Sequence, residues 1–417
     1  MNLSPGSSLV LHDYRISEVD SPAAWRRAGF AVGVGTIGSV GMWSMPVALP
    51  FVQADFGITR ADASLPYTLA MMGFGLGGVA IGRLCDRFGV AVAIMLGSLA
   101  LCVGYVGASL VSSPLMLGLM HLFIGVGASA TFGPLMADTS QWFLRHRGVA
   151  VAMAASGNYV GGALWPPVLQ HAMAAAGWRH TFIGVGIFCA LATVPFIFAL
   201  WRRAPAHPAA WTLEAASTGP AGNLGVSPNA LMVLLCVAGL ACCVAMAMPQ
   251  VHIVAYCGDL GYGPARGAEM LSAMLGFGIL SRIGSGLIAD RLGGAATLLI
   301  GSVLQGIALF LYLLFDGLVS LYIISALFGL FQGGIVPMYA IIVRHYFPAK
   351  EAGIRVGIVL MATLLGMALG GWMSGVIFDQ TGSYRVAFLN GLIWNVVNAM
   401  IVLWLMLRPT GRLAAVQ

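Results

Sequence analysis

The chain has 417 residues, of which 59% are hydrophobic and only 8% are charged. A soluble domain carries about a quarter charged residues, so this chain lacks the polar surface needed to face water on all sides. The composition excludes a soluble enzyme and favours a protein solvated by lipid. The net charge of +6 does not indicate nucleic acid binding, because the basic residues fall in short clusters between apolar runs.

The first residues and the cysteines indicate neither a processed leader nor a metal centre. The N-terminus is polar from Asn2 to Ser21 and lacks a short apolar core with a cleavage site, so we expect no signal peptide. The seven cysteines form no CxxC pair and no metal-ligand spacing, which is typical of small residues packed between helices. With no nucleotide loop and no nucleophile–base motif, we expect no metal, no cofactor and no enzymatic activity.

Charge-free stretches mark the expected membrane helices in chain order. A span needs about 20 residues. The stretch 88–137 is long enough for two spans, with a turn at Ser112 to Pro114, and 268–290 is an apolar span interrupted by one arginine. The sequence therefore predicts an all-α membrane protein of twelve spans: 28–54, 63–82, two within 88–137, 148–178, 180–201, 215–258, 268–290, 292–315, 317–343, 356–378 and 386–407.

The basic residues of the loops predict the orientation of the chain. If the N-terminus is cytoplasmic, fifteen Lys and Arg residues lie in cytoplasmic segments and four in outer loops; the four are Arg60, Arg179, Arg266 and Arg385. Cytoplasmic loops of membrane proteins carry the excess of basic residues. We therefore expect both termini to be cytoplasmic. The twentieth basic residue, Arg282, belongs to neither side.

An internal repeat divides the chain into two halves. The segment from Gly82 to Arg87 recurs as Gly286 to Arg291, so that Asp86 and Asp290 are 204 residues apart. Pro134 and Pro337, each after a glycine-rich run, are 203 apart. Two pseudo-symmetric six-helix halves follow, and a substrate path is expected between such halves. The predicted organisation is an N-terminal half at 1–203, a polar cytoplasmic linker at 204–228 and a C-terminal half at 229–417.

The segment from Gly82 to Gly89 resembles the loop motif of the major facilitator superfamily between its second and third helices. That resemblance implies the major facilitator fold and a conformational latch, in which charged helix ends pair with neighbouring helices to hold one state. The glycines allow a tight turn. A plain positively charged loop is the alternative. The predicted latch residues are Gly82, Asp86, Arg87, Asp290 and Arg291.

Within that superfamily, the chain is similar to the monocarboxylate transporters and their bacterial relatives, including oxalate–formate exchangers. The likeness rests on four stretches: Gly125 through Pro134 and Trp142 to Ala150, Pro249 to Gly261, Ser281 to Arg291, and Phe378 to Tyr384. The resemblance implies a small organic anion as substrate, protons as the coupled ion, and a multi-pass position in the cell inner membrane. We expect a functional monomer with the lipid bilayer as its surroundings and no nucleic acid partner.

Arg282 is the sharpest candidate for substrate binding. It lies eight residues before Asp290, about 12 Å up the helix from its cytoplasmic end. A charge at that depth costs several kcal/mol unless it meets water or a partner, and its guanidinium matches a carboxylate in bidentate fashion. In the family resembled, the arginine of this helix binds the substrate carboxylate. A structural pair with an acid or with backbone carbonyls is the alternative.

The chain departs from its resembled relatives at three places. Animal monocarboxylate transporters carry an aspartate one turn before this arginine, where Gly278 stands, and a lysine after the proline of the first helix, where Val47 follows Pro46. Oxalate exchangers use a second cation in the eleventh helix, but Gly357 to Phe378 is uncharged. By charge balance, one deep arginine favours a monoanion and leaves the proton carrier open.

Two side chains are candidates for carrying a coupled proton. His252, toward the outer end of the seventh span, titrates near neutral pH, and anchoring at the membrane interface is an equal alternative. Asp138 lies at the inner end of the fourth span, where contact with water or Arg145 ranks above proton coupling. His121 is expected only to pack with one hydrogen bond.

Four further residues are candidates for the wall of the substrate cavity. Asn158 and Tyr159 fall in the middle of the fifth span, and a buried amide in lipid needs a partner. Tyr339 follows Pro337, and Trp43 lies in the first span. For each, simple helix packing is an even alternative.

The leading hypothesis is transport of a small monocarboxylate by alternating access, coupled to protons. Exchange of carboxylates is the nearest alternative. Efflux of neutral or lipophilic compounds is a further one, since 22 Met and 10 Trp residues could line an apolar cavity. A membrane sensor is disfavoured, because the longest piece outside the expected spans is about 25 residues long.

Overall fold

The apolar runs of the chain fold as helices throughout. The computed structural model describes residues 18–203 and 226–408, and within these ranges all regular structure is helical. Most of the polar N-terminal segment and of the predicted linker 204–228 lie outside the described residues. The helices are α2 (Pro22–Gly38), α3 (Val40–Phe56), α4 (Arg60–Phe88), α5 (Val90–Leu110), α6 (Pro114–Ser129), α7 (Gly133–Gln141), α8 (Arg147–Ala199), α10 (Pro228–Asp259), α11 (Pro264–Leu292), α12 (Gly294–Leu314), α13 (Leu318–Gln332), α14 (Ile335–Tyr346), α15 (Ala349–Thr381) and α16 (Tyr384–Leu407).

Most of these elements are long and apolar enough to cross a membrane. Eleven helical stretches in the described ranges meet that test when α2 joins α3, α6 joins α7 and α13 joins α14. One of the eleven, α8, has 53 residues, more than twice the roughly 20 that a span needs. Gly177 inside it has φ 79° and ψ 157°, which no α-helix contains, so α8 is two helices that meet at this glycine.

Helix ends recur at the spacing of the sequence repeat. Gly89 ends α4 and Gly293 ends α11, 204 residues later, with φ of 93° and 83°. Such positive φ values are strained for a residue with a Cβ, so glycine is required at both turns. The other left-handed glycines include two more such pairs, Gly57 with Gly261 and Gly177 with Gly382. The pseudo-symmetry predicted from the sequence is therefore present in the backbone.

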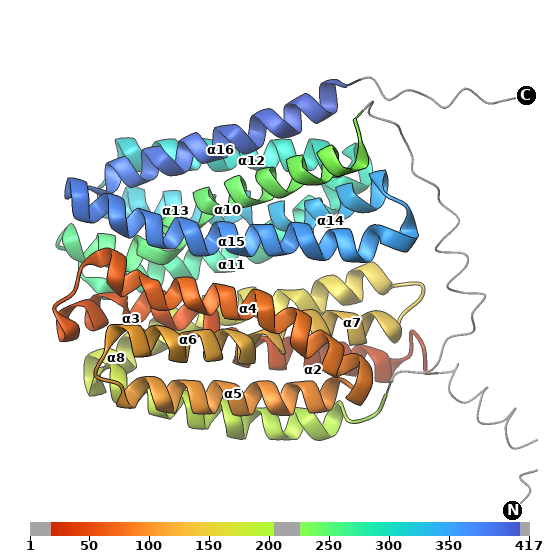
Figure 1. Ribbon diagram of the computed structural model, residues 1–417, viewed down its shortest axis with the longest axis horizontal. Helices are drawn as coiled ribbons and strands as arrows, with labels where there is room; N and C mark the ends of the chain where they lie inside the picture. Colours follow the sequence, from red (N-terminus) through yellow and green to blue (C-terminus); the bar gives the residue numbers. More distant parts are fainter. Residues whose placement is uncertain (1–17, 204–225, 409–417) are drawn as a thin grey trace, which may run out of the picture.

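The helices form two bundles that lie side by side (Figure 1). Helices α2 to α8 make one bundle and α10 to α16 the other, and the bundles meet along a seam where α4 packs on α15, α8 on α11 and α3 on α10. Small residues allow close approach there: a Cβ on Gly375 of α15 would lie 2.8 Å from Cα of Ala61 on α4. The hydroxyl of Thr68 on α4 also donates to the carbonyl of Ala368 on α15 at 3.0 Å.

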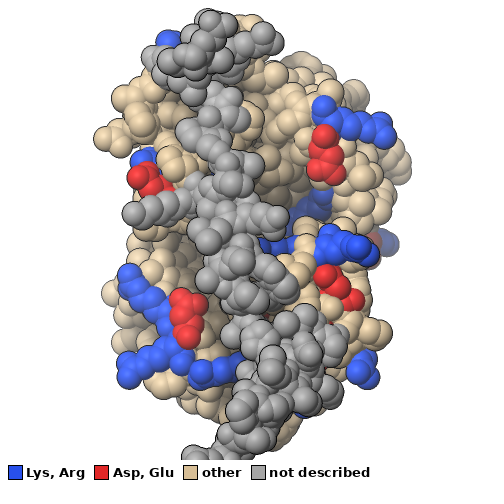
Figure 2. Space-filling model, turned by 90° about the vertical axis from the view of Figure 1, so that its right-hand side faces the viewer, with Lys and Arg blue, Asp and Glu red and all other residues tan. Residues whose placement is uncertain are grey.

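The two ends of the bundles differ in charge. The described segments before α2, after α8, before α10 and after α16 all lie at the right-hand end in Figure 1, called here the linker end. Figure 2 shows this face, where basic side chains gather beside acidic ones. Its described arginines are Arg26, Arg27, Arg83, Arg87, Arg145, Arg147, Arg202, Arg203, Arg291, Arg344, Arg355 and Arg408; the opposite end carries Arg60, Arg179, Arg266 and Arg385.

At the opposite end, called here the outer end, each half presents an aspartate at the same point of the repeat. Asp55 follows from α3 and Asp259 from α10, 204 residues apart. Asp55 accepts a charged hydrogen bond from Arg179 of its own half at 2.7 Å. Asp259 pairs instead with Arg60 of the other half, with an N–O distance of 3.1 Å.

Candidate functional site

Arg282 projects from α11 toward α8 of the opposite half. Its Nη1 lies 3.4 Å from the carbonyl oxygen of Ala155, and its guanidinium carbon lies 4.2 Å from the ring centre of Tyr159. The Nε atom is buried and has no hydrogen-bond partner. Among the described residues no acid forms an ion pair with Arg282. The seam therefore holds a cation whose partners are an aromatic ring and one long contact to a carbonyl.

The ring of Tyr159 explains why the position one turn before Arg282 is a glycine. A Cβ built on Gly278 would lie 2.4 Å from Cε1 of Tyr159, closer than any side chain tolerates. The aspartate of the resembled animal transporters would collide with this ring. In this chain an aromatic face, which attracts a cation by its quadrupole, occupies the space of the missing acid.

Asn158 and Trp43 adjoin Tyr159 on the same face of the seam. The indole Nε1 of Trp43 donates toward the side-chain Oδ1 of Asn158 at 3.2 Å and toward its carbonyl at 3.3 Å. Gly162, one turn along α8, packs against the indole and against Leu275 of α11. The structure thus brings Arg282, Tyr159, Asn158 and Trp43 together from three helices and both halves.

Tyr339 is the cavity candidate that lies apart from this group. It is fully buried, and its hydroxyl donates to Oδ1 of Asn398 at 2.8 Å, between α14 and α16. The amide of Asn398 in turn donates to the hydroxyl of Ser302 on α12 at 2.7 Å. Its hydrogen bond therefore joins helices within the C-terminal half, which agrees with the packing alternative rather than with substrate binding.

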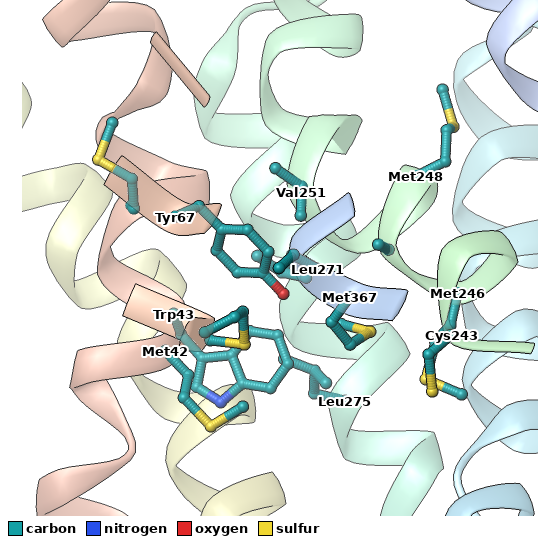
Figure 3. Close-up of a cluster of buried hydrophobic side chains, with 14 of the residues drawn as sticks. Met42, Trp43, Tyr67, Cys243, Met246, Met248, Val251, Leu271, Leu275 and Met367 are labelled. Atoms are coloured by element: carbon teal, nitrogen blue, oxygen red, sulfur yellow. The ribbon is translucent and has the colours of Figure 1, made fainter. Parts of the chain in front are cut away.

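The middle of the seam is lined by thioethers and aromatic rings. Figure 3 shows Tyr67 of α4 pointing its hydroxyl into a cluster of apolar side chains from both halves. The cluster includes Met42, Trp43, Cys243, Met246, Met248, Val251, Leu271, Leu275 and Met367. The Tyr67 hydroxyl is buried without a hydrogen-bond partner in the described part of the chain. The surroundings on the outer side of Arg282 therefore suit an apolar group.

Asp138 lies in a buried ion pair within the N-terminal half. Its carboxylate accepts two hydrogen bonds from Arg27, at 2.8 and 2.9 Å, and Arg27 also donates to the carbonyl of Leu200. The side chains of Arg27 and Asp138 are 6% and 11% exposed. The expected partner, Arg145, is not the one the structure supplies. His121, by contrast, packs as expected, with Nδ1 2.9 Å from the carbonyl of Leu117.

His252 is fully buried in a hydrogen-bonded network at the outer end. Its Nε2 lies 2.7 Å from the carbonyl oxygen of Gly371 and its Nδ1 3.0 Å from the hydroxyl of Tyr384. The same hydroxyl accepts a hydrogen bond from Arg60 at 2.7 Å. Sequence reasoning counted Arg60 only as an outer-loop residue, although it begins α4 and is 7% exposed.

The predicted latch residues lie at the linker end, at the ends of α4 and α11. Asp86, Arg87, Asp290 and Arg291 are exposed, and none of them takes part in an ion pair with another described residue. The backbone carbonyl of Arg87 accepts a hydrogen bond from Arg203 at 3.3 Å. A Cβ on Gly82 would meet nothing within 4 Å, so the latch role stays a prediction.

The cavity and side-chain chemistry offer no metal centre in the described ranges. No group of three or more His, Cys, Asp or Glu side chains lies close enough there to hold an ion. The chemistry that the seam can perform is recognition: one unpaired guanidinium, one amide, an indole and a surround of apolar side chains. Two membrane-spanning bundles that meet around such a group are the architecture of a membrane transporter.

Comparison with known proteins identifies the family. The sequence profile of the Major Facilitator Superfamily matches residues 31–321 and 270–416, and the chain belongs to this superfamily. It is therefore an integral, multi-pass membrane protein and a transporter.

The relatives narrow the likeness further. The chain is 24% identical to monocarboxylate transporter 13 of Bos taurus over 315 residues, covering 73% of this chain and 71% of that one. It is 24% identical to the agnestins efflux protein AgnL12 of Paecilomyces divaricatus over 333 residues, covering 80% and 75%. The crystal structure of the nucleoside transporter NupG superposes with a TM-score of 0.72 at 13% identity, covering 91% and 99%, which supports the fold. The chain is thus monocarboxylate transporter-like.

Proposed function

We propose that this protein transports a small organic monoanion of the monocarboxylate class. One observation carries the proposal: Arg282 lies in the seam with its Nε buried and unpartnered and with no acid to neutralise it. An unpaired charge at membrane depth costs several kcal/mol, and a bound carboxylate would supply both the missing charge and the missing acceptors. Tyr159 holds the guanidinium from below, and Asn158 is within the same group of side chains.

Transport proceeds by alternating access in this proposal. The chain crosses the membrane twelve times in two six-helix halves, with α8 providing two spans, and the arginine-rich linker end is cytoplasmic, as the positive-inside rule favours. The halves rock about the seam, which exposes Arg282 to each side in turn. The protein acts as a monomer in the cell inner membrane.

Symport with protons is the coupling we propose, and exchange is its rival. The basic group that binds the anion is an arginine, which keeps its proton, so a coupled proton must travel on another residue or on the substrate. Exchange predicts that substrate on the far side accelerates uptake and that an uncoupler leaves uptake intact. Symport predicts the reverse for the uncoupler.

A second candidate function is efflux of lipophilic compounds. It is favoured by the thioether and aromatic cluster in the seam (Figure 3) and by the likeness to an efflux protein. The two functions differ in one requirement. A monocarboxylate transporter needs the carboxylate of its ligand, whereas efflux of neutral compounds does not.

Uptake into proteoliposomes tests the proposal. Labelled monocarboxylates are offered under an inward proton gradient, and a thermal-shift screen of purified protein against carboxylates and their methyl esters selects the ligands. We expect Arg282→Ala and Arg282→Lys to abolish saturable uptake, because neither presents the bidentate fork. Arg266→Ala, which removes an exposed outer arginine, is the matched control and should transport like wild type. Wild-type uptake by both Arg282 variants would refute the binding role.

A further inference from the structure

A chain of hydrogen bonds at the outer end joins four helices from the two halves. Arg60 of α4 donates to both carboxylate oxygens of Asp259 on α10, at 3.1 Å each, and to the hydroxyl of Tyr384 on α16 at 2.7 Å. Asp379 at the end of α15 accepts hydrogen bonds from the backbone N–H groups of Arg60 and Ala61, at 2.9 and 2.7 Å. The C-terminal half thus binds both the side chain and the first turn of α4.

Further contacts enclose the Arg60 guanidinium. It lies 4.6 Å from the ring centre of Phe378 and 5.7 Å from that of Tyr384. Carboxylates at the N-terminus of a helix are stabilised by its free N–H groups and its dipole, which adds to the hold of Asp379 on α4. Every partner of α4 in this cluster belongs to the other half, so the halves cannot separate at the outer end while it is intact.

The hydrogen-bond directions fix the protonation state of His252 in this arrangement. A backbone carbonyl only accepts, so Nε2 of His252 donates to Gly371. The hydroxyl oxygen of Tyr384 already accepts from Arg60, and its single hydrogen is free to point to Nδ1, 3.0 Å away. Nδ1 accepts that hydrogen only if it carries none itself. The closed cluster therefore matches a neutral His252.

A second proton on His252 would disturb the cluster in two ways. The new N–H at Nδ1 would face the O–H of Tyr384, donor against donor, and the ring would become a cation behind the Arg60–Tyr384 contact. The charged groups around it are Arg60 on α4 and Asp379 on α15, with Asp259 and Tyr256 on its own helix. A cation at His252 repels Arg60 and competes with α4 for the two carboxylates, and each effect weakens the contact between halves.

We propose that His252 is the proton-binding site of the transporter and that Arg60, Asp259, Asp379 and Tyr384 form an outer gate that closes only when His252 is neutral. The proposal rests on the proposed alternating access and deepens its coupling. A proton taken up from the outer side stabilises the outward-open state, because a ligand shifts the population toward the state that binds it better. The gate closes again after His252 has lost that proton, which ties one proton to each cycle.

Labelling of a gate cysteine tests the gate without any transport assay. Ser64 is fully buried one turn inward from Arg60 on α4, so Ser64→Cys reacts with an impermeant maleimide on the outer side only when the gate opens. Thr381→Cys, exposed at the same end, corrects for the effect of pH on thiol reactivity. The untouched chain, with its seven native cysteines, gives the background. We expect the labelling ratio to rise as outer pH falls, by up to about tenfold per pH unit, the limit for one linked proton.

Variants of the histidine give the decisive comparison. His252→Gln keeps a donor for Gly371 and an acceptor for Tyr384 but cannot become charged, so the ratio should stay low at every pH. His121→Gln, at another fully buried histidine, should keep the wild-type pH dependence. A pH-dependent ratio in His252→Gln, equal to that of wild type, would overturn the proposal.

A second variant guards against misfolding of the first. Asp379→Asn removes the charge that holds the first turn of α4, and we expect labelling to rise severalfold at neutral outer pH; unchanged labelling would refute the gate. Arg282→Ala should retain the pH-dependent labelling although it no longer transports. If no carboxylate is transported but the labelling follows these expectations, the proposed substrate fails and the gate stands.

Discussion

Moving the ring of Tyr159 should weaken anion binding at Arg282 without any change to the arginine. In Gly278→Ala the new Cβ would lie 2.4 Å from Cε1 of Tyr159, and ordinary contact begins at 3.4 Å, so the ring must move by about 1 Å. The ring centre now lies 4.2 Å from the guanidinium carbon. A partly desolvated cation–π contact contributes about 1 kcal/mol, and 1.4 kcal/mol is a factor of ten in affinity. We expect KM to rise about fivefold.

The assay is uptake of the accepted monocarboxylate into proteoliposomes, with thermal-shift titration of the same variants in detergent. Gly276→Ala is the matched control, because its Cβ would meet only Ala163 at 3.8 Å on the same helix. Tyr159→Phe keeps the ring and should stay within about twofold of wild type, whereas Tyr159→Leu should match Gly278→Ala. Equal KM values for Gly278→Ala and Gly276→Ala would refute the role given to the ring.

Three further outcomes are expected. Asp138→Asn leaves Arg27 buried without its counterion and should cost about 3–5 kcal/mol of stability, seen as a lower Tm, while Glu351→Gln, in an exposed pair, should cost under about 0.5 kcal/mol. Gly293→Ala forces a Cβ residue to φ 83° and should cost about 1–2 kcal/mol in the same melt, while Gly284→Ala, whose Cβ meets nothing within 4 Å, should be tolerated. Burial raises the pKa of Asp20, but hydrogen bonds from the N–H groups of residues 144–146 and the charge of His146 outweigh it, so the pKa lies below the usual 3.8. That carboxylate therefore stabilises the 144–146 turn above pH 3.8 and releases it as pH falls further, which amide exchange should show as faster exchange below about pH 4 and, at neutral pH, in Asp20→Asn.

Features that depend on composition and spacing could be predicted from the sequence. The apolar runs gave the helices, the division of α8 was expected beside Arg179 and is found at Gly177, and the spacing of Asp86 and Asp290 revealed the repeat. The depth of Arg282 was readable for the same reason, since a charge within an apolar run stands out against lipid. These properties belong to single helices and require no knowledge of their neighbours.

Features that depend on which helices meet could not be predicted. Arg60 binds partners 199 and 319 positions away along the chain, so its short flanking sequence reads as an ordinary loop. Asp138 was assigned a neighbour in sequence, Arg145, but its partner is Arg27, 111 positions away. Tyr339 lies in the expected span, yet the face it occupies meets α16 rather than the seam. Rotation of each helix about its axis decides such contacts.

The pairing of Asp55 with Arg179 and of Asp259 with Arg60 shows how duplicated halves came to divide their labour. Two copies of one ancestral position now serve different ends: the first fastens its own bundle, and the second fastens one bundle to the other. A symmetric molecule with both copies turned inward would have no bond that distinguishes open from closed at this end. The loss of equivalence at a single aspartate therefore gives the outer mouth something to break, and hence a threshold that the cell can set.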